Sequence, residues 1–117
     1  MAKVREYCGR YIYEINNGII REYCGRYVYQ LDGNILREYG GRYRYEITND
    51  YKIREYCGPY IFSLEGNIFR QYIGRYLLQI ENNRLIREYC GRYLYEIEGT
   101  VTTLELLALI MVLIRKY

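Results

Sequence analysis

The sequence predicts an all-β protein, a closed radial array of six short β-hairpins resembling a flower or propeller, with one C-terminal α-helix. The first observation is repetition, because one unit recurs six times in 117 residues at a spacing of 16 or 17. Such a period suits two short strands and two turns. The second is that each half unit alternates with a period of two residues, as strands do. The third is a strand-like half unit left over at each end. The units begin at Arg5, Arg21, Arg37, Arg54, Arg70 and Arg87.

The first strand of each unit alternates between tyrosine or aliphatic residues and polar residues. In RYVYQL (26–31) the alternation places Tyr27, Tyr29 and Leu31 on one face. Successive side chains of a strand point to opposite faces, so we expect this face to be buried. The six first strands are expected at residues 10–15, 26–31, 42–47, 59–64, 75–80 and 92–97.

Each first strand is followed by a turn of the Asn, Asp or Gly type, written NNG, DGN, TND, EGN, ENN or EGT. These residues tolerate the positive φ angles of tight hairpin turns, so they are expected to be the hairpin tips. The second strand, such as GIIREY or NILREY, then ends at a Cys-Gly or equivalent corner. We expect this corner to carry the chain into the next unit.

The two ends of the repeat array are complementary. KVREY near the N-terminus and RYLYEI near the C-terminus are the missing halves of a sixth hairpin. Pairing them closes the array and removes both exposed strand edges. The alternative is an open solenoid, which needs polar caps at its ends. Because the N-terminal strand looks like any internal one, the sequence favours closure.

The tandem Tyr/Ile hairpins with D-G-N tips and the short apolar C-terminal helix resemble the four-fold β-flower domain family. In that family short hairpins radiate about an axis, and the resemblance covers nearly the whole chain. It implies a radial arrangement of hairpins here. This chain has six units where the family name implies four, and the resemblance carries no activity over to its residues.

The C-terminal segment 100–117 does not follow the repeat, and we treat it as a separate region from the hairpin domain 1–99. Thr102 and Glu105 fit a capping box, which predicts a helix from about 103 to 115. The stretch from Leu106 to Ile114 is apolar on every side, so the helix must be covered all round.

Three kinds of cover are open for this helix: a partner subunit, the hairpin domain of its own chain as an intramolecular plug, or a membrane. About 14 residues reach only about 21 Å, which is short of a bilayer core of about 30 Å, so membrane contact is not expected. We expect a homo-oligomer that forms through residues 103–115. The interface residues would be Leu106, Leu107, Ile110, Met111, Leu113 and Ile114.

Composition argues against an enzyme. The chain has no histidine and one serine, Ser63, and its glycines lie at turns rather than in a phosphate-binding loop. We therefore expect no catalytic residue, no metal and no cofactor. A net charge of +3 does not favour duplex nucleic acid, and the start of the chain shows no secretory signal, which favours the cytoplasm. The cysteines, one per unit in four units, are interpreted as small half-buried thiols.

Sixfold repetition turns single residues into rings. Arginine begins every unit, and a tyrosine two residues later shares its face, while the acid between them shares a face with apolar residues. The sequence leaves open which register faces the axis. In one reading these residues form a ladder of Arg–Glu and Arg–Tyr contacts between neighbouring hairpins. In the other they converge on an anion. The candidate ligand-binding residues are Arg5, Arg21, Arg37, Arg54, Arg70, Arg87, Tyr23, Tyr39, Tyr56, Tyr72 and Tyr89.

Three functions follow from these patterns. The first is a non-enzymatic structural or interaction module that self-associates through its C-terminal helix. The second is a sensor or sponge for an anionic small molecule such as a nucleotide, held by arginine forks and tyrosine rings. The third is a membrane-acting effector that uses the helix.

Overall fold

The computed structural model describes residues 1–115 and contains twelve strands and one helix; residues 116 and 117 of the predicted C-terminal segment lie outside the described residues. The strands are four to six residues long, which is the length that the repeat period predicts. They are β1 (Ala2–Glu6), β2 (Tyr11–Asn16), β3 (Ile19–Glu22), β4 (Tyr27–Asp32), β5 (Ile35–Glu38), β6 (Tyr43–Ile47), β7 (Lys52–Glu55), β8 (Tyr60–Glu65), β9 (Ile68–Gln71), β10 (Tyr76–Glu81), β11 (Leu85–Glu88) and β12 (Tyr93–Glu98), followed by α1 (Thr103–Arg115).

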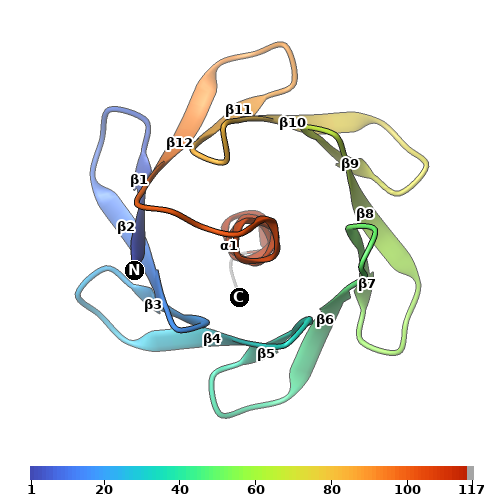
Figure 1. Ribbon diagram of the computed structural model, residues 1–117, viewed down its shortest axis with the longest axis horizontal. Helices are drawn as coiled ribbons and strands as arrows, with labels where there is room; N and C mark the ends of the chain where they lie inside the picture. Colours follow the sequence, from blue (N-terminus) through green and yellow to red (C-terminus); the bar gives the residue numbers. More distant parts are fainter. Residues whose placement is uncertain (116–117) are drawn as a thin grey trace.

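The twelve strands form one closed antiparallel barrel in which each strand pairs with its neighbours in the chain (Figure 1). The ring closes where β1 pairs with β12, with Val4 opposite Ile97 and Tyr7 N–H donating to Leu94 O at 2.9 Å. The predicted closure is therefore confirmed, as is the radial array of six hairpins. The barrel is a thick disc of 36 × 35 × 21 Å.

Two kinds of turn alternate around the disc. We call 7–10, 23–26, 39–42, 56–59, 72–75 and 89–92 the outer turns, because they project outward as six petals in Figure 1. The Asn, Asp or Gly turns that join β2 to β3 and its equivalents are the inner turns, and they stay at the ring. The tips of the petals are thus the Cys-Gly corners, and not the Asn/Asp/Gly turns that the sequence suggested.

A register shift changes the face that the first tyrosine of each unit occupies. On β3 and β4, Ile20 lies opposite Tyr29 but Arg21 lies opposite Tyr27, and the same shift recurs in all six petals. Such a β-bulge re-aims the side chains beside it. Tyr29 is buried as predicted, whereas Tyr27 is 48% exposed and Val28 packs against the core. The prediction that Tyr27 is buried is wrong for this reason.

The barrel core is built from the residue that precedes each repeated arginine. This position is always apolar and its side chain is fully buried in every unit. It points inward because it lies on the face opposite the arginine. The six residues are Val4, Ile20, Leu36, Ile53, Phe69 and Ile86.

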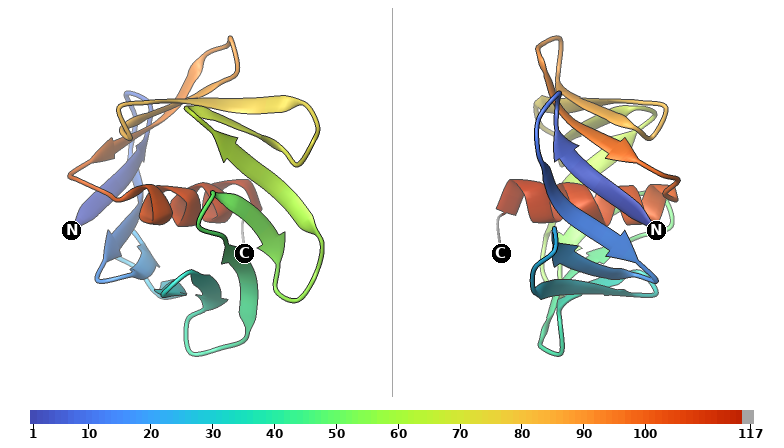
Figure 2. Two further views of the ribbon diagram at one scale, coloured as in Figure 1. Left: turned by 45° about the vertical axis from the view of Figure 1, so that its right-hand side comes forward. Right: turned by 90° about the vertical axis from the view of Figure 1, so that its left-hand side faces the viewer.

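The helix α1 lies along the axis of the barrel, inside the ring of strands (Figures 1 and 2). The predicted capping box is present, since Glu105 N–H donates to Thr102 Oγ1 at 3.1 Å and Thr102 N–H donates to Glu105 Oε1 at 2.9 Å. Within residues 1–115, no helix is both long and apolar enough to cross a membrane.

The barrel of the same chain covers the helix. Of the six residues expected at a subunit interface, Leu106, Leu107, Ile110 and Met111 are fully buried and Leu113 is 8% exposed. Ile114, near the end of α1, is 39% exposed. The structure thus shows the intramolecular plug, and no partner subunit is needed to cover these side chains.

Candidate functional site

A belt of tyrosine pairs surrounds the outside of the barrel. Each pair joins two neighbouring petals, as where Tyr11 of one petal meets Tyr23 of the next with ring centroids 5.0 Å apart. Separations of this size are favourable for aromatic pairs. The six pairs are Tyr7–Tyr93, Tyr11–Tyr23, Tyr27–Tyr39, Tyr43–Tyr56, Tyr60–Tyr72 and Tyr76–Tyr89.

The repeated arginines lie on this outer surface, over the tyrosine that follows them in the same petal. Arg87 Cζ is 4.8 Å from the centre of the Tyr93 ring, and its Nε and Nη2 donate to Gly91 O at 3.0 and 2.6 Å. Arg21, Arg37, Arg54 and Arg70 also lie over the tyrosine of their own petal. Each of these five guanidinium groups therefore stabilises its petal by cation–π contact.

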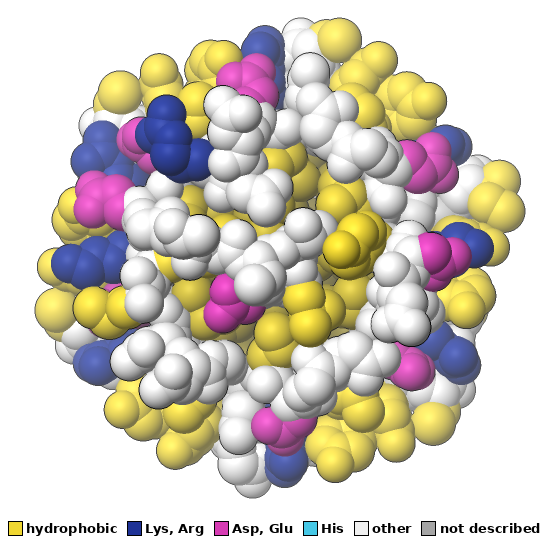
Figure 3. Space-filling model, in the orientation of Figure 1, with side chains coloured by type: hydrophobic (Ala, Val, Ile, Leu, Met, Phe, Trp, Pro, Cys, Tyr) yellow, Lys and Arg dark blue, Asp and Glu magenta, His cyan; other side chains and the backbone are white. Residues whose placement is uncertain are grey.

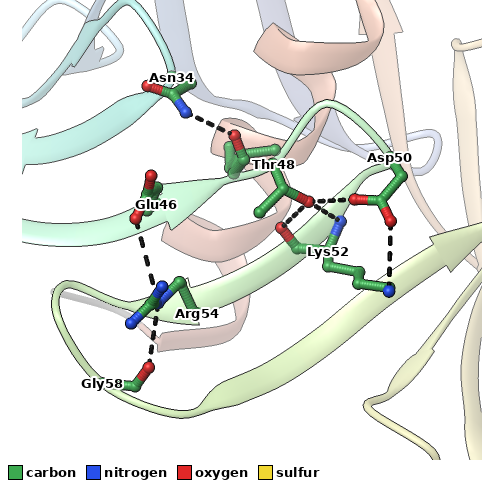
Figure 4. Close-up of polar contacts among 8 residues, drawn as sticks. Asn34, Glu46, Thr48, Asp50, Lys52, Arg54 and Gly58 are labelled. Atoms are coloured by element: carbon green, nitrogen blue, oxygen red, sulfur yellow. Dashed lines mark hydrogen bonds and ion pairs between the residues drawn. The ribbon is translucent and has the colours of Figure 1, made fainter.

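Every repeated arginine also has an acid within 4.0 Å. The nearest atoms are 3.1 Å apart for Arg70 and Glu65, and 4.0 Å for Arg54 and Glu46 (Figure 4). Figure 3 shows the same pattern at the rim, where basic and acidic side chains lie next to one another. The contacts form the ladder between petals, and the arginines point away from the axis rather than toward a shared anion. The other pairs are Arg5–Glu96, Arg21–Glu14, Arg37–Asp32 and Arg87–Glu81.

The pKa of one tyrosine of the belt, Tyr11, is shifted by a neighbouring acid. Its hydroxyl donates to Glu98 Oε2 at 2.5 Å, which raises the pKa of Tyr11 above its ordinary value, with burial as a second cause. The ammonium of Lys3 lies 5.3 Å from the same ring and 5.6 Å from that of Tyr23. This tyrosine pair therefore already holds a cation from its own chain.

The acidic register lies where the strands run into the outer turns. Glu6, Glu22, Glu38 and Glu88 each lie within 4.0 Å of the arginine four residues later. Glu38 also accepts a hydrogen bond from Arg44 at 2.7 Å, which raises the pKa of that guanidinium. The sequence associated this register with an inward face, but its acids are 38–54% exposed where these pairs are measured.

The four cysteines are exposed, so the interpretation as half-buried thiols is wrong. Each occupies the same position of an outer turn with a positive φ of 53–57°, a conformation that most residues avoid. Gly40 and Ile73 occupy the equivalent position in the other two petals, with φ of 64° and 50°. Glycine adopts a positive φ without strain, so Gly40 suits this position of the third petal, whereas the cysteines and Ile73 adopt the same conformation under strain.

Two neighbouring cavities meet at Leu113, near the end of α1. The larger, of about 560 Å³, is open to solvent; the smaller, of about 130 Å³, is almost wholly apolar. They share Tyr95 and Leu113. The larger is lined by Glu6, Arg10, Tyr11, Ile12, Tyr13, Glu22, Tyr23, Tyr95 and Leu113, and the smaller by Leu78, Ile86, Leu94, Tyr95, Ile110, Leu113 and Ile114.

One of the residues that line the smaller cavity breaks the pattern of the repeat. Leu78 lines it, and the five equivalent positions carry an aromatic ring. The helix also covers the wall unevenly, since Tyr29 and Tyr45 are buried while Tyr13 and Tyr95 are only half-buried. Sequence reasoning missed this cavity, although the break in an aromatic register was a readable signal. The aromatic residues are Tyr13, Tyr29, Tyr45, Phe62 and Tyr95.

In the described part of the chain, no group of three or more His, Cys, Asp or Glu side chains is placed to hold a metal ion. Comparisons with protein-family models, with curated proteins and with solved structures found no match for this chain. The candidate site therefore rests on its own geometry.

Proposed function

We propose that the protein is a non-enzymatic binding module for a small amphipathic molecule. The observation that carries this proposal is the pair of cavities that meet at Leu113: the smaller lies between α1 and β10, β11 and β12, and the larger extends over the first two petals. Concave sites with apolar walls and a few polar groups are the usual form of small-molecule sites. The apolar part of the ligand would lie against Leu78, Leu94 and Leu113.

The polar part of the larger cavity indicates the kind of head group. Two acids, Glu6 and Glu22, and one base, Arg10, line it together with four tyrosines. Glu6 and Glu22 pair with Arg10 and Arg26, and Lys3 lies over the Tyr11 and Tyr23 rings. The lining therefore favours an uncharged head group that donates hydrogen bonds to its oxygen atoms. It does not favour the nucleotide suggested by the arginine rings, because those arginines lie outside the barrel beside their own acids.

The test is to fill the smaller cavity with the side chain that the other repeats use. Native mass spectrometry on protein purified from cells should show a retained small molecule, and Leu78→Phe should abolish it while raising Tm. Gln79→Ala, on the neighbouring position of the same strand and on the outer face, should keep the ligand. A retained molecule that survives Leu78→Phe unchanged would contradict the proposal, as would protein that carries none.

Self-association is a second candidate, and the exposed Ile114 favours it. This side chain lies beside the smaller cavity and is 39% exposed at the end of an otherwise buried helix. Two copies could pack through this end of the barrel. Ile114→Asp should then give a smaller species in the same mass spectra. Leu107→Asp is not a useful test, because it places a charge inside the barrel and destabilises the monomer itself.

A further inference from the structure

The outer face of the barrel carries six cross-strand rows of three residues, each ending in a repeated arginine. The central residue of a row lies opposite a residue of the strand before it and opposite the arginine of the strand after it. In five rows this central residue is Glu or Gln. The rows are Lys3–Glu14–Arg21, Ile19–Gln30–Arg37, Ile35–Glu46–Arg54, Lys52–Ser63–Arg70, Ile68–Gln79–Arg87 and Leu85–Glu96–Arg5.

The row of Glu14 shows what a complete row with two cations looks like. Lys3 and Arg21 are the cross-strand neighbours of Glu14, whose Oε1 lies 3.7 Å from Arg21 Nε. The ammonium of Lys3 lies over the rings of Tyr11 and Tyr23. The carboxylate is largely covered, with 13% of the Glu14 side chain exposed. In the row of Glu96 the equivalent carboxylate oxygen is 3.3 Å from Arg5 Nε. A carboxylate is thus the group that this position holds against the arginine.

The row of Ser63 has the same two cations but no carboxylate between them. Ser63 is 3% exposed, and its hydroxyl is buried without a hydrogen-bond partner among the described residues. Arg70 Nε is also buried without a hydrogen-bond partner there, as are Arg21 Nε beside Glu14 and Arg5 Nε beside Glu96, so the unpartnered Ser63 hydroxyl is what sets this row apart. Nη1 and Nη2 of Arg70 donate to Glu65 Oε1 and Gly74 O. Two polar atoms on paired residues of β8 and β9 are therefore unsatisfied.

The two cations of this row, Lys52 and Arg70, each pair with an exposed acid that lies outside the row. The ammonium of Lys52 is 3.2 Å from Asp50, whose side chain is 65% exposed at an inner turn (Figure 4). Glu65, the acid beside Arg70, is 58% exposed. Ion pairs at such exposed positions are weakened by solvent. Lys52 and Arg70 thus each pair with an acid outside the row, and the central position of the row, Ser63, provides no carboxylate.

We propose that the row of Lys52, Ser63 and Arg70 binds the carboxylate of another molecule. One carboxylate oxygen accepts hydrogen bonds from Ser63 Oγ–H and Arg70 Nε–H, and Lys52, the neighbour of Ser63 on β7, supplies the second positive charge. Lys52 and Arg70, the cross-strand neighbours of Ser63, have side chains that are 39% and 21% exposed, and a shift of these two long side chains admits the carboxylate. This site lies on the outer face of β7, β8 and β9, and it is independent of the cavities beside α1.

The experiment follows the Ser63 amide and the Arg70 Nε–H by NMR while acetate replaces chloride at constant ionic strength. We expect a saturable shift at Ser63, Lys52 and Arg70 and none at the Glu14 row. A short glutamate-containing peptide is titrated in parallel. Binding of acetate alone identifies a small carboxylate as the source, and tighter binding of the peptide identifies an acidic side chain of another protein.

The repeat supplies matched variants. Ser63→Glu gives the row its own carboxylate, so it should raise Tm and abolish the acetate shift. Glu14→Ser should create a second acetate site between Lys3 and Arg21. Gln30→Ser is the control, because its row has Ile19 in place of a lysine, and it should bind acetate more weakly than either.

Three results would overturn the proposal. The first is the absence of a saturable acetate shift at Ser63 and Arg70, and the second is a shift of equal size in folded Ser63→Glu. The third is inorganic phosphate causing a larger saturable shift than acetate, which would show that the row recognises another oxyanion. If Ser63→Glu does not fold, Lys52→Gln takes its place and must weaken the acetate shift.

Discussion

Tyr7 stacks on Tyr93, with their ring centroids 5.0 Å apart and their planes at 25°. The two residues belong to the first petal and the last strand of the chain, whereas the other five pairs join petals that follow one another in sequence. The contact therefore completes the tyrosine belt at the same seam where β1 pairs with β12.

Removing this pair should weaken the seam. Tyr7→Ala is expected to lower the free energy of unfolding, and a double-mutant cycle with Tyr93→Ala should give a coupling of about 0.5–1.5 kcal/mol, which is typical of aromatic pairs. Chemical denaturation measures both. The control cycle combines Tyr7→Ala with Tyr43→Ala, whose rings belong to different pairs and should add without coupling. Equal coupling in both cycles would contradict a direct contact.

Ile73→Gly should stabilise the protein. Ile73 is β-branched, has φ of 50° and is 79% exposed, so it carries strain with little burial to offset it. Gly40 occupies the same position in the third petal. Relief of the left-handed strain, less the entropy of an added glycine, should gain about 1 kcal/mol in thermal or chemical unfolding. Ile73→Val keeps the strain and should show no gain; an equal gain in this variant would refute the explanation.

Thr102→Ala should cost about 1 kcal/mol, because it removes the side chain that accepts from Glu105 N–H at the start of α1. The loss should appear in the midpoint of chemical denaturation with an unchanged slope. Thr102→Ser keeps the hydroxyl and is the matched control. If the alanine and serine variants are equally stable, the capping box contributes nothing here.

Asp50 should report on its inner turn through its titration. The Thr48 hydroxyl donates to its carboxylate, and this bond, followed by the one from Lys52, lowers the pKa of Asp50 below its ordinary value (Figure 4). A depressed pKa in the folded state adds stability above the unfolded pKa of about 3.9, and this is lost as the pH falls through the folded value. Thr48→Val should raise the pKa measured by carboxyl NMR more than Lys52→Met does. The reverse order would assign the effect to Lys52.

The ring could be predicted from the sequence because its signals are repeated. The period, the alternation around residues 26–31 and the two half units at the ends all indicate twelve short strands and their closure. The bulge that turns Tyr27 outward could not be read in this way, because a strict period of two assumes an unbroken ladder. Its signal is spatial, since it depends on which residues pair across the petal.

The contents of the barrel were harder to predict than its wall. A helix that is apolar on every side must be buried. From the sequence alone, a partner subunit and the barrel of the same chain explain its burial equally well. The width of the ring decides the matter, and it follows from twelve strands meeting edge to edge. Breaks in the repeat, such as Leu78 and Ser63, were readable in the sequence, but their meaning depends on whether their position faces the helix or the solvent.

The plug comes last along the chain, because α1 follows β12 and fills the space that all twelve strands enclose. During translation the twelve strands therefore leave the ribosome before the helix that packs inside them. In a nascent chain that ends before Thr103, the apolar residues that face the barrel axis have no helix to pack against. The hairpins therefore cannot form their native packing as they leave the ribosome. Folding of this domain is expected to wait until the helix has been synthesised.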